Sequence, residues 1–158
     1  AFSGESRQGV VVREIKRFDE LHGPVVAQRI AGLEPEHSTR AGTALRHATA
    51  GLMKQASAHR LLLLLSDGRP NDVDEYEGRY GLEDTRQAVV EATMQGVSVF
   101  CLTIDQAHRD YLPRIFGRDY AMIREPTRLP AVLLKCWRSR VNTGKSNTPY
   151  RTAKAFTV

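Results

Sequence analysis

The chain has 158 residues, of which 41% are hydrophobic and 26% are charged, a balance typical of one soluble globular domain. No apolar run reaches the roughly 18 residues that cross a bilayer, and the first residues lack the basic-then-apolar plan of a signal peptide, so we expect no membrane insertion. The net charge of +5 comes from residues 135–158, which hold six basic residues and no acidic one, and the near-neutral remainder argues against a nucleic-acid-binding face.

The amino-terminal part predicts a strand, a loop and a helix. Residues 9–18 begin as an apolar run and then alternate between apolar and polar positions, which predicts a strand near a sheet edge. Residues 19–41 contain a Gly-Pro pair and a further Pro, so we expect mostly loop, with a short helix at 24–31. Residues 41–58 have the pattern of an amphipathic helix. The stripe expected to face the core consists of Leu45, Ala48, Leu52, Met53 and Ala56.

Two short apolar runs, 60–67 and 97–105, predict strands that are covered on both faces, and each run ends on an aspartate. A helix is expected between them, capped by Glu83 or Asp84 and running to about Gln95. Its inner face is expected to consist of Ala88, Val89, Ala92 and Met94.

The carboxyl-terminal part predicts a short helix near 108–116, a small strand at 120–125 and a helix at 127–138. Residues 139–158 are polar without periodicity, so we expect a basic, disordered tail after a domain that spans residues 1–138. The alternation of strands and helices predicts an α/β fold with a doubly wound, mostly parallel sheet flanked by helices.

The aspartates that end the two buried runs suggest where function lies. In open parallel sheets ligands gather outside the carboxyl ends of the strands, an edge called the rim below. We expect Asp67 and Asp105 to lie at this rim.

Oxygen ligands dominate the candidate site. Carboxylates and hydroxyls without a cluster of thiolates or histidines favour a hard cation, above all Mg²⁺. The alternative is that Asp67 ends a turn and the later acids are solvated. The candidate residues are Ser38, Thr39, Thr43, Ser66, Asp67, Asn71, Asp72 and Asp74.

Other chemistries have no motif support. The chain contains no phosphate-binding glycine loop, no HExxH and no GxSxG. Its two cysteines, Cys101 and Cys136, have no metal-ligand spacing and indicate a reduced, cytoplasmic protein.

Several segments carry a family resemblance. LLLLLSDGRPND, followed by YEGRYGLEDTRQAVVEA and VSVFCLTID, resembles the von Willebrand factor A (VWA) domain, in the version found in the bacterial NorD and CbbO proteins. HSTRAGTALRHA resembles the second metal-loop segment of that family, and GRDYAMIREPTRLPAVL resembles its last strand and helix. The resemblance covers about residues 1–134 and implies a Rossmann-like doubly wound sheet.

The resemblance also implies a metal-ion-dependent adhesion site (MIDAS) built by three loops. These supply a DxSxS motif after the first strand, a threonine and an aspartate. By position, Thr39 corresponds to the threonine, with Thr43 as the alternative, and Asp67 to the aspartate, with Ser66 beside it. The residues expected to flank the site and contact a partner are His37, Arg69, Asn71 and Asp72.

One part of the family pattern has no counterpart. No DxSxS occurs in the chain, and AFSGESRQGVVVREIKRF resembles the end of the second strand and the third. We therefore expect the first, central strand to be missing from this sequence and Mg²⁺ binding by this chain alone to be weak or absent. Unpaired strand edges then favour a homo-oligomer or strand exchange.

The function implied by the resemblance is that of an adaptor in the bacterial cytoplasm and not of an enzyme. Such an adaptor links a MoxR-type AAA+ ATPase (NorQ or CbbQ) to a carboxylate on a client protein. For NorD-like proteins the client is nitric oxide reductase, activated for denitrification; for CbbO-like proteins it is Rubisco. The loop sequences favour the first.

The alternative is a Mg²⁺-dependent hydrolase, for example a phosphatase, that uses Asp67 as ligand or nucleophile. It needs a second carboxylate and a general acid, for which Asp105 and His37 are the candidates. Nucleic-acid binding through the basic tail is a third and weaker interpretation.

Overall fold

The computed structural model describes residues 1–4, 6, 9–36, 38–68, 70, 78–104, 110–134, 138 and 156–157. In chain order its elements are β1 (Phe2–Gly4), β2 (Val10–Val12), α1 (Pro24–Ala31), α2 (Ala41–Met53), β3 (Arg60–Ser66), α3 (Gly78–Met94), β4 (Val97–Thr103), α4 (Tyr111–Phe116), β5 (Tyr120–Met122), the 3-10 turn η1 (Pro126–Arg128) and β6 (Phe156–Thr157). Helical backbone continues after η1 through residues 129–134.

The central sheet is parallel, as predicted. β3 and β4 pair along their whole length, from Arg60 opposite Val97 to Ser66 opposite Thr103, and β5 continues the sheet beside β4. The strand order is β3-β4-β5-β6, while β1 and β2 form a separate antiparallel pair. Among the described residues no strand pairs with the outer edge of β3. That open edge accords with the expected lack of a central strand, and strand exchange stays a prediction.

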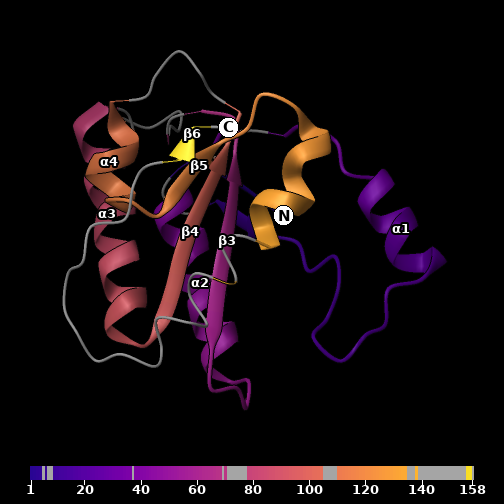
Figure 1. Ribbon diagram of the computed structural model, residues 1–158. Coiled ribbons are helices and arrows are strands. Elements are labelled where there is room, and N and C mark those ends of the chain that lie inside the picture. Colours follow the sequence, from indigo (N-terminus) through magenta and orange to yellow (C-terminus); the bar gives the residue numbers. More distant parts are fainter. Residues whose placement is uncertain are drawn as a thin grey trace.

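The period-2 pattern of β3 and β4 divides the core into two clusters, one on each face of the sheet. Leu62 and Leu64 point to the face packed by α2, α3 and α4, whereas Leu61 and Leu63 point to the face packed by the helical segment 129–134. Figure 1 shows α3 and α4 on one side of the long β3 and β4 arrows and the orange helix on the other. Leu61 to Leu64 are therefore covered on both faces, as the apolar run predicts, whereas Leu65 at its end is exposed.

The inner face of α2 differs from the prediction. Its buried residues are Ala41, Gly42, Ala44, Leu45 and Thr49, whereas Ala48, Met53 and Ala56 are exposed. The helix also ends at Met53 and not near residue 58. Arg60, at the start of β3, donates to the carbonyls of Leu52 (3.1 Å) and Gln55 (2.9 Å), and so satisfies backbone groups that a helix end leaves free.

The helix predicted from Glu83 or Asp84 begins earlier. α3 starts at Gly78, and Gly81, Leu82 and Thr85 in its first two turns are buried. Met94, expected on the inner face, is exposed. Gly81 is buried inside this helix, where a position without a side chain allows close packing.

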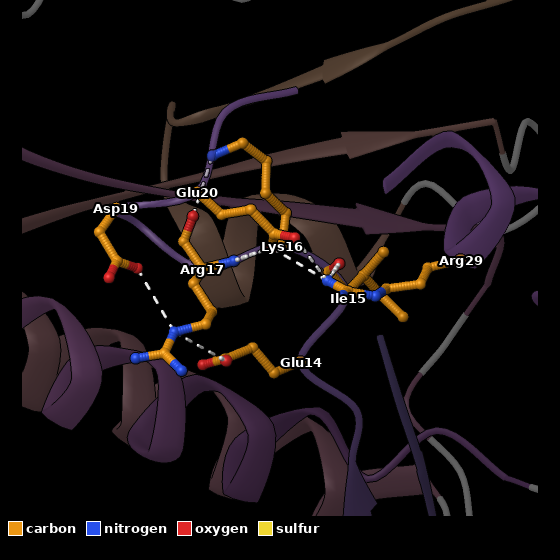
Figure 2. A network of polar contacts seen from close by, with 7 residues as sticks. All are labelled: Glu14, Ile15, Lys16, Arg17, Asp19, Glu20 and Arg29. Atoms are coloured by element: carbon orange, nitrogen blue, oxygen red, sulfur yellow. Dashed lines mark hydrogen bonds and ion pairs between the residues drawn. The ribbon is translucent and has the colours of Figure 1, made fainter. Parts of the chain in front are cut away.

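The strand predicted over residues 9–18 is much shorter. The ladder between β1 and β2 ends where the Arg13 amide donates to the Ala1 carbonyl (2.8 Å). Beyond it the charged side chains bond locally. Arg17 pairs with Asp19 (3.3 Å) and Glu14, and Arg29 of α1 donates to both carboxylate oxygens of Glu20 (2.9 Å), as Figure 2 shows.

The last elements follow the predicted order. The helix α4, the strand β5 and the helical segment after η1 occupy the positions expected for a short helix, a small strand and a final helix. Phe156 and Thr157 add a short parallel strand beside β5, which the polar composition of the tail does not predict. In the described part of the chain, no helix has the length and apolarity to cross a membrane.

Candidate functional site

Asp67 lies where the sequence predicts it, directly after β3 at the rim. It is exposed, and no hydrogen bond or ion pair joins it to another residue in the described part of the chain. The turn that carries it is held by its neighbours. Ser66 Oγ donates to the Gly68 carbonyl (2.8 Å) and accepts from the Gly68 amide (3.3 Å), and Tyr111 Oη donates to the same carbonyl (2.9 Å). The carboxylate is thus presented to solvent by a fixed backbone.

Thr39 lies in a different environment. It directly precedes Arg40, the N-cap residue of α2, and follows Ser38, which exchanges two backbone hydrogen bonds with Gly4 of β1 (2.8 and 2.9 Å). Thr39 lines a cavity of about 190 Å³ between β1, β2 and the loop before α2. In its wall Ser3 Oγ donates to Glu36 (2.8 Å). The lining residues are Ala1, Phe2, Ser3, Arg13, Gly32, Leu33, Glu34, Glu36, Ser38 and Thr39.

The structure does not bring all the predicted ligands into one cavity. Neither Asp67, Ser66 nor Thr43 lines the cavity beside Thr39. Thr43 is exposed in the first turn of α2, and the Ser66 hydroxyl is already bonded to Gly68. The predicted residues that lie outside the described part of the chain are His37, Arg69, Asn71, Asp72, Asp74 and Asp105.

A complete metal site is not formed by the described residues. They contain no group of three or more His, Cys, Asp or Glu side chains that could hold an ion. Thr39 and Asp67 supply the hydroxyl and carboxylate oxygens that Mg²⁺ prefers, so the donor types fit the ion, but further oxygen ligands are needed. The sequence-based expectation of weak binding by this chain therefore stays a prediction.

A cluster of ion pairs holds α2, whose amino end follows Thr39, against α3. Arg46 Nε donates to Glu91 (2.7 Å) and Arg46 Nη1 to Asp84 (2.7 Å). These bonds, the one to Glu91 foremost, raise the pKa of Arg46, and the Arg46 bond lowers the pKa of Glu91 from its ordinary 4.5. Arg46 and Glu91 are therefore both charged at neutral pH, so the ion pair between α2 and α3 is kept there.

Tyr111 is the contributor to the rim that sequence reasoning missed. It lies in a short apolar helix, where an aromatic residue reads as core, and its ring is indeed buried. The signal that could have drawn attention to it is general: a buried tyrosine hydroxyl usually finds a hydrogen-bond partner. Which partner it finds depends on the tertiary fold.

Comparisons with known proteins support one family. The von Willebrand factor type A domain family matches residues 2–126. An uncharacterized protein of Pseudomonas aeruginosa is 51% identical over 138 residues, which are 87% of this chain and 22% of that protein. The protein NorD of Brucella melitensis is 49% identical over 138 residues (87% and 22%), and the protein NorD of Stutzerimonas stutzeri is 50% identical over 126 residues (79% and 21%).

The chain spans about a fifth of the length of these curated relatives. No solved structure matches it.

Proposed function

The chain belongs to the von Willebrand factor type A domain family and is of the NorD type, and from this premise we propose that it is the metal-dependent partner-binding module of an adaptor. The adaptor connects a MoxR-type AAA+ ATPase, of the NorQ kind, to an acidic site on a client protein. The client class favoured by the NorD resemblance is nitric oxide reductase, and Rubisco is the second.

The observation that carries this proposal is the presentation of Asp67. Here Ser66 and Tyr111 make the bonds that hold the turn, and the Asp67 carboxylate has no bond to a described residue. An exposed carboxylate on a fixed turn at the rim is suited to an external ligand.

Mg²⁺ is the ligand that the donor types favour. Asp67 and Thr39 are the described residues proposed to hold it, together with oxygen ligands from segments outside this chain. Held between neutral hydroxyls and few carboxylates, Mg²⁺ would supply a positive charge to which a carboxylate of a partner would bind. That attraction is electrostatic, and it requires no covalent chemistry from this chain.

The test is a binding experiment on the full-length protein with the variant Asp67→Ala. Capture of the ATPase and the client is measured in Mg²⁺ and again after chelation with EDTA. We expect Asp67→Ala to weaken client capture about 10- to 100-fold, the usual cost of losing a group that supports a metal. EDTA should weaken capture at least as much, because it removes the ion itself. Thermal unfolding should be unchanged, because Asp67 makes no described contact.

The matched control is Asp19→Ala, which removes another exposed carboxylate in the loop before α1. It should leave client capture unchanged. Capture that Asp67→Ala does not weaken would refute the proposed site. A phosphatase activity that depends on Asp67 would favour the hydrolase alternative in its place.

A further inference from the structure

Tyr111 connects α4 to the turn that carries Asp67, across 43 positions of sequence. We propose that Tyr111 is a positioning residue for the Asp67 carboxylate, and that it acts through the Gly68 carbonyl. This inference rests on the proposed function of the rim, and it names a residue that none of the family motifs quoted above includes.

The rigidity of α4 is the first argument. Tyr111 is 3% exposed, and Leu112, Ile115 and Phe116 of the same helix are buried in the core cluster shared with Leu62 and Leu64 of β3. A hydroxyl on a ring fixed in this way has little freedom to move. Sites are held most precisely when their supporting groups are locked by packing on helices and strands.

The bonding of the Gly68 carbonyl is the second argument. A carbonyl oxygen has two lone pairs, and here it accepts from both Tyr111 Oη (2.9 Å) and Ser66 Oγ (2.8 Å). Both bonds draw this carbonyl toward the protein. The Gly68 carbonyl, in the residue directly after Asp67, is thereby held from two sides.

The exposure of Asp67 is the third argument. Since its carboxylate makes no bond to a described residue, no described side-chain contact sets its direction. Among the described residues, the backbone of the turn is the support for this side chain. Loss of the Tyr111 bond would let the turn rotate, and it would weaken the binding of any ligand that depends on Asp67.

The decisive variant is Tyr111→Phe, which keeps the buried ring and removes only the hydroxyl. Its control is Tyr120→Phe, because Tyr120 packs partly buried against the same cluster and its hydroxyl bonds to no described residue. Mg²⁺ affinity of the full-length protein is measured by calorimetry, together with thermal unfolding and the amide NMR signals of Asp67 and Gly68. We expect Tyr111→Phe to weaken the affinity for Mg²⁺ about 10-fold and to shift the amide signals of both Asp67 and Gly68. Tyr120→Phe should do neither.

The outcomes separate this inference from the proposed function. If Asp67→Ala weakens Mg²⁺ binding and Tyr111→Phe does not, the positioning role is wrong and the site stands. If Asp67→Ala also leaves the affinity unchanged, the proposed site itself fails. A Tyr111→Phe protein that melts earlier but binds Mg²⁺ as tightly as the wild type would show a purely structural role.

A second variant covers the case in which Tyr111→Phe does not fold. Ser66→Ala removes the other bond to the Gly68 carbonyl without altering the core. It should weaken the affinity for Mg²⁺ by a similar factor. An unchanged affinity in Ser66→Ala would overturn the proposal that the orientation of this carbonyl controls Asp67.

Discussion

Two buried threonines on the packed helices α2 and α3 differ in a single bond. Thr85 Oγ1 donates to the Gly81 carbonyl (2.7 Å), whereas Thr49 Oγ1 is buried without a hydrogen-bond partner among the described residues. Both side chains are at most 2% exposed. A buried hydroxyl without a partner costs free energy, while a bonded one contributes to stability.

The substitution Thr→Val is therefore expected to change the free energy of unfolding in opposite directions at the two sites. Thr49→Val should raise the free energy of unfolding by about 1 kcal/mol, because it removes an unpaired hydroxyl at almost constant shape. Thr85→Val should lower it by about 1 kcal/mol. Urea unfolding of the two variants measures both values. A loss of stability in Thr49→Val would mean that its hydroxyl has a partner in solution.

At the same scale, the site was only partly predictable from sequence. Asp67 could be placed at the rim because a strand as apolar as β3 is expected inside a sheet. The residue that follows such a strand then lies at the carboxyl end of the sheet. The bond from Tyr111 to Gly68 has no local signal, since it joins residues 43 positions apart. Periodicity predicts which residues are buried and does not predict which carbonyl a buried hydroxyl meets.

At the scale of elements, β3 shows how burial alternates and then ends. Leu62 and Leu64 are each 8% exposed, whereas Leu65, the next residue, is 60% exposed. Leu64→Ala should lower the free energy of unfolding by about 2–5 kcal/mol, because it leaves a cavity in the main core cluster. Leu65→Ala should cost no more than about 0.5 kcal/mol, as at other exposed positions.

The two leucine variants form a matched pair, since the same atoms are removed one residue apart. Chemical denaturation with constant m-values would measure the difference. Similar losses for both variants would indicate that Leu65 is covered in solution, for example by a strand paired with the open edge of β3.

The elements that were predicted well are those with one dominant pattern. The apolar runs of β3 and β4 read clearly because both faces of a parallel strand are buried. The stripe of α2 was misassigned because alanine occurs on either face of a helix, so Ala48 carried little information. The start of α3 was placed too late, at Glu83 or Asp84, because glycines such as Gly78 and Gly81 ordinarily indicate a loop.

At the scale of the whole molecule, the order of strands and helices from β2 to β5 was predicted from the sequence, and the expected lack of a central strand stays a prediction. The β1–β2 pair and the β3–β6 sheet are separate, and β3 has an open edge in the described part of the chain. A site built from several loops depends on how distant segments pack, which periodicity does not predict. Thr39 and Asp67 could therefore be named individually, and a site that joins them stays a proposal.

Mg²⁺ titration by calorimetry most directly tests whether Asp67 is one ligand of a site completed outside this chain. It is carried out on the 158-residue chain and on the full-length protein, each as wild type and as Asp67→Ala. We expect the full-length protein to bind one Mg²⁺, Asp67→Ala to weaken that binding, and the 158-residue chain to bind weakly or not at all. Tight stoichiometric binding by the 158-residue chain would contradict the proposal that the site is completed outside this chain. An affinity of the full-length protein that Asp67→Ala does not change would contradict the proposal that Asp67 is a ligand.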